Sequence, residues 1–355
     1  MSAEADEPDR APDGRHPRET YQLFGHRDAE AELVRAMADA RMHHAWLFVG
    51  PKGVGKATLA WRFARKLLGA GGPGLQADPD DPVSRGAASL SHPDLMVIRR
   101  PWDPKASKWR SEITVEEARR LEGFFALRPS LGGWRVAILD AADDLNPNAA
   151  NALLKTLEEP PERAVILLVA HAPGAVLGTI RSRCRRLALR ALSPEDTARA
   201  APDAGSEALA LSGGSPGRAA ALASLDAAAS YRSVASLLER APKMPADAKA
   251  ALADKAARSE TASDLICDLV EDWLARAAQA ACEAPVREVL PGESAAMARL
   301  AGGRPERLVA AWEAARDARR ATDGLNLDRG AGLLALLRAV EDAVAGKQRQ
   351  EFPVG

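Results

Sequence analysis

Short apolar runs alternate with amphipathic patterns along the first half of the chain. The runs lie at 45–49, 95–98, 135–139, 165–169 and 187–189. The stretches between most of them carry apolar residues three or four positions apart, which is typical of helices. Buried strands that alternate with helices favour a parallel sheet covered on both faces. We therefore predict an α/β domain over residues 21–190.

The pattern changes after residue 192. From there to about residue 345 the apolar residues keep helical spacing, as over 261–282 and 305–321, and no strand pattern is found. We predict a small helical domain over 191–229 and a larger all-α domain over 230–345. The first twenty residues are polar, acidic and rich in proline, so we expect a disordered N-terminus over 1–20, and a tail over 346–355.

The charges are almost balanced. Lys and Arg number 48 and Asp and Glu number 49, a net charge of −1. This balance argues against a general nucleic-acid or membrane coat, which needs a basic surplus. The three cysteines form no C-x-x-C pair, which excludes a cysteine zinc site. The longest strongly apolar run, 164–170, is far below the roughly 18 residues of a membrane span. We expect a soluble, cytoplasmic protein.

One glycine-rich segment predicts phosphate binding. The segment Gly50-Pro-Lys-Gly-Val-Gly-Lys56 fits the pattern G-x-x-x-x-G-K and lies between a predicted strand and a predicted helix. In such loops the glycines let backbone N–H groups face phosphate oxygens, and the lysine reaches the terminal phosphates. Gly50, Gly53, Gly55 and Lys56 are therefore candidate nucleotide-binding residues. The alternative is a glycine turn before an ordinary helix.

The metal-binding half of this pattern is incomplete. Ala57 stands where a Ser or Thr hydroxyl normally ligates Mg²⁺, and Thr58, a weaker candidate, points about 100° further round the helix. Asp140 ends a strand and fits the acid that holds the metal, although it could also be an acid that caps a local loop. Ala141 follows it, at the position where active ATPases with such a strand-end acid carry a glutamate. We expect phosphate to bind but no firmly held Mg-ATP.

Four further segments, read together and in order, carry a family resemblance. They resemble the AAA+ clamp loaders of bacterial DNA polymerase III, firmly over 21–189 and more loosely beyond, where Gly213–Arg218 and Gly324–Asp328 still fit in order. The segments are His44-Ala-Trp-Leu-Phe-Val-Gly-Pro-Lys-Gly-Val-Gly-Lys56, His92-Pro-Asp-Leu95, Asn151-Ala-Leu-Leu-Lys-Thr-Leu-Glu-Glu-Pro-Pro161 and Thr179-Ile-Arg-Ser-Arg-Cys184.

The resemblance implies a ring subunit. In this family an ATPase-like domain is followed by a helical lid and a helical collar that joins five subunits, and the ring loads a sliding clamp onto primed DNA. The implied partners are gamma/tau-like motor subunits, a delta subunit, the clamp and primed DNA, with no membrane. Relatives often carry a four-cysteine zinc module, but the matching stretch 69–93 has no cysteine, so we expect no zinc.

The missing hydroxyl and glutamate fit the stationary subunit of such a ring. We therefore expect weak binding of ATP or ADP at most and no activity of its own, within a DNA-directed DNA polymerase complex. The alternative is an active gamma/tau-like ATPase. A third class, a small-molecule P-loop kinase, is disfavoured by the long helical half, which has no acceptor-binding motif.

Several polar residues gain a role only through the resemblance. It implies that Arg183, in Ser182-Arg183-Cys184, reaches the ATP of a neighbouring subunit; the alternative is a solvated basic edge shared with four nearby arginines, Arg181, Arg185, Arg186 and Arg190. Arg218 lies near the position where an arginine of active relatives senses the γ-phosphate; the alternative is an ordinary exposed arginine. His171 follows the fourth strand, where active relatives place a polar sensor; the alternative is a strand-end histidine with no nucleotide role.

Trp102 and Trp109 lie among five basic residues of the segment 99–110. They could stack on single-stranded nucleic acid. The preferred interpretation is a loop that folds back on the domain.

Overall fold

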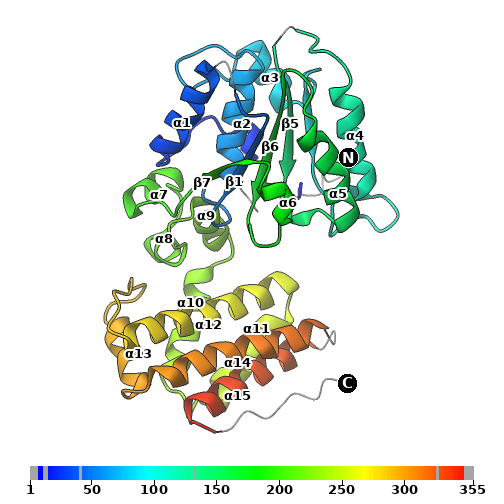
Figure 1. Cartoon of the computed structure of the whole chain (residues 1–355). Coiled ribbons are helices and arrows are strands. Elements are labelled where there is room, and N and C mark those ends of the chain that lie inside the picture. Colours follow the sequence, from blue (N-terminus) through cyan, green and yellow to red (C-terminus); the bar gives the residue numbers. More distant parts are fainter. Residues whose placement is uncertain (1–6, 11–14, 40–41, 132, 325–327, 348–355) are drawn as a thin grey trace. The chain divides into compact units, whose positions relative to one another are not determined.

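A computed structural model describes residues 7–10, 15–39, 42–131, 133–324 and 328–347 (Figure 1). The chain divides into two compact units. Unit 1 comprises residues 1–204 and 212–221, and unit 2 comprises 205–211 and 222–355. The division falls within 191–229, so the limits of the predicted lid and collar stay a prediction. The expected tail lies largely outside the described residues, as does the centre of the 324–328 match.

Unit 1 is built on a five-stranded parallel sheet with the order β2-β5-β6-β1-β7. The five strands coincide with the five apolar runs, except that the last begins and ends earlier, and a separate antiparallel hairpin follows β2. The strands are β1 (Ala45–Val49), β2 (Leu95–Ile98), β3 (Trp102–Asp103), β4 (Lys108–Trp109), β5 (Arg135–Asp140), β6 (Ala164–Ala170) and β7 (Arg185–Ala188).

Helices cover both faces of this sheet (Figure 1). In β1, Trp46 and Phe48 pack into one apolar core with α1, α2 and α3, while Leu47 packs into the other with α4 and α5. The predicted α/β fold class is confirmed. The helices are η1 (Pro17–Glu19), α1 (Arg27–Ala38), α2 (Lys56–Leu67), α3 (Pro82–Ala88), α4 (Val115–Phe125), η2 (Ala142–Asp144), α5 (Pro147–Glu158), α6 (Gly178–Arg181) and α7 (Pro194–Ala200).

The N-terminal residues differ from the expected disorder. Residues 7–10 and 15–20 pack on the domain, and the side chains of Asp9 and His16 are almost fully buried. The reason is a set of partners far along the chain: Arg65 on α2 donates to the carbonyls of Arg18 and Thr20, and Arg99 binds two acids of the segment. The composition of the segment predicted disorder, because the residues that hold it, Arg65 and Arg99, lie far along the chain.

Every regular element that the structure describes in unit 2 is an α-helix, and turns and loops join these helices. Trp273 and Tyr231 are its largest fully buried side chains, and α14 packs along α15 and α12. No helix in the described part of the chain is long and apolar enough to cross a membrane. The helices, with α9 shared by both units, are α8 (Ser206–Leu211), α9 (Pro216–Ser224), α10 (Ala227–Leu238), α11 (Ala246–Ala257), α12 (Glu260–Ala281), α13 (Glu293–Ala301), α14 (Pro305–Gly324) and α15 (Arg329–Val344).

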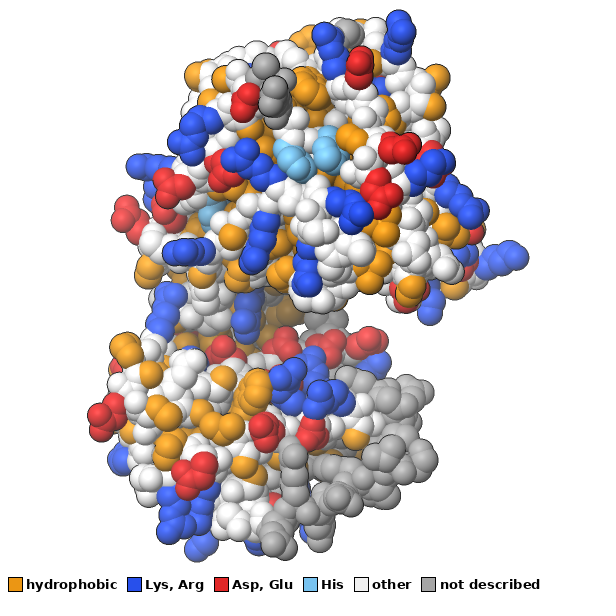
Figure 2. Space-filling model, in the orientation of Figure 1, with side chains coloured by type: hydrophobic (Ala, Val, Ile, Leu, Met, Phe, Trp, Pro, Cys, Tyr) orange, Lys and Arg blue, Asp and Glu red, His pale blue; other side chains and the backbone are white. Residues whose placement is uncertain are grey.

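Acidic and basic side chains are interspersed over both units on the face shown in Figure 2. This distribution agrees with the net charge of −1. A basic site, if present, is therefore a local feature.

Candidate nucleotide site

The glycine-rich loop joins β1 to the N-terminus of α2 and has the backbone of a phosphate-binding loop. Gly50, Gly53 and Gly55 have φ angles of +147°, +78° and +104°, which side chains disfavour. A Cβ at Gly50 would lie 2.2 Å from the carbonyl oxygen of Leu189, and one at Gly53 would lie 2.5 Å from Ser215 Oγ. Only glycine fits these two positions. The loop and the helix N-terminus thus retain the cradle that suits phosphate.

Lys56 is turned back onto this loop. Its ammonium donates to the carbonyl oxygens of Gly50 and Pro51, both at 2.7 Å. The side chain is buried, and this burial lowers the pKa of Lys56 to about 8. A phosphate oxygen would have to replace these carbonyl partners, so the lysine is available only through rearrangement.

The metal-binding half of the site is chemically deficient. Asp140 ends β5 and is buried; burial first, and then the negative charge of Asp9, raise the pKa of Asp140 to about 8. A metal ion at Asp140 would therefore have to compete with a proton near pH 7. Ala57 and Ala141 offer no oxygen in their side chains. The residues fit a phosphate group and do not fit a metal ion.

Two polar groups tie the ends of β5 and β6 together. The carboxylate of Asp143 accepts hydrogen bonds from the backbone N–H groups of His171, at 2.9 Å, and Ala172, at 3.1 Å. His171 Nε2 lies 3.9 Å from Asp140 Oδ1. Burial, followed by the charge of Lys56, lowers the pKa of His171 to about 4, so its ring is neutral at pH 7. The structure thus brings His171 beside Asp140, at the carboxyl ends of the parallel strands, where the glycine-rich loop also begins.

The first turn of α9 lies directly on the phosphate loop. Ser215 Oγ donates to the carbonyl of Lys52 at 2.8 Å, and the N–H of Gly217 donates to the carbonyl of Gly53 at 3.0 Å. Ser215 Oγ also accepts the N–H of Arg218 at 3.2 Å. These contacts place the backbone of Arg218 beside the loop, although Lys52 and Ser215 are 163 residues apart in the sequence.

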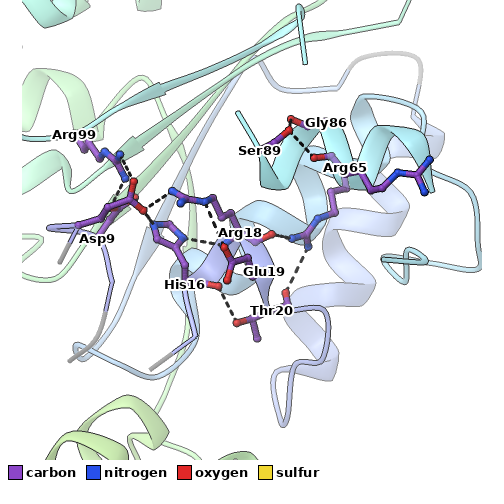
Figure 3. Close-up of polar contacts among 11 residues, drawn as sticks. Asp9, His16, Arg18, Glu19, Thr20, Arg65, Gly86, Ser89 and Arg99 are labelled. Carbon is purple, nitrogen blue, oxygen red and sulfur yellow. Dashed lines mark hydrogen bonds and ion pairs between the residues drawn. The ribbon is translucent and has the colours of Figure 1, made fainter. Parts of the chain in front are cut away.

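Sequence reasoning missed an ionic cluster beside Asp140, which we call the N-terminal clasp: Glu7, Asp9, His16, Arg18 and Arg99 (Figure 3). Arg99 holds Glu7 at 2.5 Å and Asp9 at 2.8 Å. Arg99 directly follows β2, whose Ile98 pairs with Leu139 of β5, so the clasp lies next to Asp140 at the ends of adjacent strands. In the sequence Glu7 and Asp9 are only two of several acids near its start, and nothing linked them to Arg99, because Asp9 and Arg99 are 90 residues apart.

The clasp is an ionic cluster and does not have the chemistry of a metal centre. His16 Nδ1 accepts the backbone N–H of Arg18 at 3.1 Å, which places the ring proton on Nε2. Nε2 lies 3.2 Å from both Glu7 and Asp9. A metal-ligating nitrogen must be free of its proton, and the second ring nitrogen then usually donates. Here the roles are reversed, and two guanidiniums already balance the carboxylates.

Arg183 lies near the surface just after α6. Its Nη2 forms an ion pair of 2.6 Å with Glu158 Oε1 at the end of α5, and its Nη1 donates to the carbonyl of Thr179 at 3.0 Å. Its side chain is 36% exposed. Such a solvent-exposed pair contributes little, about 0–1 kcal/mol, so its partner is readily exchanged.

Two neighbouring arginines are engaged by their own domain. Arg181 donates to the carbonyl of Pro173, while Arg185 binds Glu32 and lies over the ring of Trp46. These contacts favour the alternative interpretation, a structural edge, for Arg181 and Arg185.

The comparisons with known proteins match this part of the chain. Residues 25–193 match the model of the family described as "DNA polymerase III, delta subunit". Over these residues, the chain is similar to subunits of DNA polymerase III. The DNA polymerase III subunit delta' of Pseudomonas aeruginosa is 41% identical over 185 residues, which cover 50% of this chain and 55% of that protein. The delta' subunit of Yersinia pestis is 36% identical over 43% of each chain.

Tau and gamma subunits of DNA polymerase III match as well. The tau/gamma subunit of Haemophilus influenzae is 32% identical over 50% of this chain and 24% of its own length. The chain thus spans about half, or less, of the relatives it matches. A solved gamma subunit-related protein of Thermotoga maritima aligns with a TM-score of 0.43 and 18% identity, over 89% of this chain and all of that one.

Proposed function

We propose that this chain is the stationary, delta-prime-type subunit of a clamp loader and does not hydrolyse ATP itself. Its partners in this proposal are gamma/tau-like motor subunits and a delta subunit in a five-membered ring, together with the sliding clamp and primed DNA. Unit 2 supplies the collar that joins the ring. The similarity to two delta' subunits supports this assignment.

The observation that carries the proposal is the state of Asp140. Its carboxyl is buried, has a pKa of about 8 and lies in a site where Ala57 and Ala141 replace the metal-binding hydroxyl and the glutamate. An ATPase of this class needs a charged acid to hold the metal and a second group to orient water. The loop of Gly50, Gly53, Gly55 and Lys56 would still hold the phosphates of weakly bound ATP or ADP, with Arg218 nearby.

The proposed contribution of the chain to hydrolysis is Arg183. A guanidinium is planar, stays charged at any working pH and fits phosphate oxygens through two donors. Supplied to a neighbour's ATP, such a group neutralises charge on the transferring phosphoryl group, and in GTPases it contributes about 10³–10⁵ in rate. Release from Glu158 costs little, because both side chains are exposed.

The alternative is an active gamma/tau-like subunit, which the tau/gamma similarities favour. A steady-state hydrolysis assay on the isolated chain distinguishes the two. We expect a rate no higher than that of a Lys56→Ala control. Turnover clearly above that control would overturn the proposal.

A further inference from the structure

The segment with two tryptophans forms a compact hairpin, which we call the Trp102 hairpin (residues 101–110). Trp102 pairs with Trp109 across its two short strands, and their rings meet edge to face with centroids 5.3 Å apart. The Asp103 carboxylate accepts two backbone N–H groups of the turn, and the N–H of Arg110 closes the base of the hairpin on the carbonyl of Pro101 at 2.9 Å. The hairpin is thus ordered before any partner binds.

The expected fold-back holds for only one of the two rings. Trp109 is partly buried, and the Arg99 guanidinium lies 5.4 Å from its centroid. Trp102 is 39% exposed and is the one exposed Trp, Tyr or Phe among the described residues. The Trp109 ring packs against the Trp102 ring in an edge-to-face arrangement, and Trp102 is presented to solvent on this base.

The hairpin carries a surplus of positive charge, with Lys105, Lys108 and Arg110 against one acid, Asp103, which pairs in register with Lys108 across the strands. Asp103 is the only acid of the hairpin, and Arg110 lies 3.6 Å from its carboxylate. Arg100 is paired with Asp144. Lys105 and Lys108 are exposed, and neither forms an ion pair with any residue that the structure describes.

We infer that the Trp102 hairpin binds single-stranded nucleic acid, with a base stacked on Trp102 and the adjoining phosphates on Lys105 and Lys108. Every base has a π-face, so such binding is tolerant of sequence. The ammonium groups attract the backbone as point charges. A stacked duplex would offer no free base face, so single strands are preferred.

The charges favour nucleic acid over a protein partner. Interfaces between proteins are enriched in Trp and Arg but depleted in Lys. Here the two exposed hairpin cations that form no ion pair among the described residues are both lysines, and they belong to the same short hairpin as Trp102. A rigid aromatic beside free ammonium groups matches the alternating bases and phosphates of a single strand.

The experiment measures the fluorescence anisotropy of a labelled oligo-dT with the full chain at low salt. We expect Trp102→Ala to weaken binding about 5- to 150-fold, since one stacked base contributes about 1–3 kcal/mol. Trp102→Phe should retain most of the affinity. An abasic oligonucleotide of the same length, which keeps its phosphates, should bind wild type as weakly as oligo-dT binds Trp102→Ala.

The lysines are tested through salt. The double variant Lys105→Gln, Lys108→Gln should reduce the magnitude of the slope of log K against log [salt] by about 1.4, which corresponds to two lost phosphate contacts. Lys243→Gln, at an exposed lysine of unit 2, is the matched control and should leave affinity and slope unchanged. Thermal melts establish that each variant is folded.

Three results would overturn the inference. Wild type that does not bind the oligonucleotide excludes the site. Equal affinity of wild type and Trp102→Ala excludes stacking. If Trp102→Ala leaves oligonucleotide binding intact but prevents assembly with other subunits, the hairpin is a protein contact. None of these results bears on the proposed ATPase silence, which the hydrolysis assay tests separately.

Discussion

Glu158 Oε1 and Arg183 Nη2 are 2.6 Å apart, so the arginine implied to serve a neighbouring subunit is held by an acid of its own domain. Glu158 is the last residue of α5, and Arg183 follows α6. In the isolated chain this pair keeps the guanidinium in place near the surface. Within a ring, a phosphate group would compete with Glu158 for the same donors.

Arg183→Ala should leave the chain folded and incorporated but reduce ATP hydrolysis by the assembled complex, by the share of the total rate that comes from the site which this arginine serves. Arg183→Lys should restore little, because a point charge does not reproduce the two-donor geometry. Steady-state ATPase activity of the reconstituted complex measures both. Arg186→Ala is the control; deficiency there with full activity in Arg183→Ala would identify a different arginine as the donor.

Asp140→Asn should stabilise the protein at alkaline pH. The folded-state pKa of Asp140, about 8, lies above the usual value of 3.8, so the stability of the folded state is fully present below pH 4 and is lost as pH rises toward 8. One pKa unit corresponds to about 1.4 kcal/mol, so even half of this shift would destabilise the folded protein by roughly 3 kcal/mol at pH 8. Urea unfolding at pH 5 and pH 8 measures the effect. A gain that does not grow between these pH values would contradict the buried, neutral carboxyl.

Asp9 and Asp140 should be energetically coupled only at high pH. The charge of Asp9 helps to raise the pKa of Asp140, so the two carboxylates repel each other once Asp140 ionises. A double-mutant cycle of Asp9→Asn and Asp140→Asn should show coupling at pH 9 and almost none at pH 5. Coupling of equal size at both pH values would mean that the clasp acts on Asp140 through packing and not through charge.

A chain that ends at Ala229 should fail to join the ring, because it lacks most of the helices of unit 2. The measurement is co-purification with gamma/tau-like and delta subunits, with circular dichroism to verify that the remaining domain is folded. Full incorporation of the shortened chain would show that unit 1 alone makes the subunit contacts.

The sequence located the five strands of the sheet because each is a short apolar run between helical patterns, and burial on both faces requires that composition. It also located the phosphate loop. Gly50 and Gly53 are there because a Cβ would collide with Leu189 or Ser215, and a backbone restriction of this kind leaves a local signature. The missing oxygens at Ala57 and Ala141 are also visible in the sequence, because both positions are found by counting from the loop and from the end of a strand.

Only the tertiary structure decided the charge state of Asp140, the order of residues 7–10 and the exposure of Trp102. Each depends on groups distant in sequence: Asp9 approaches Asp140 through Arg99, and Trp109 supports Trp102 under the guanidinium of that same arginine. Burial and Coulomb interactions act through space and fall off with distance, so a pattern along the chain does not record them.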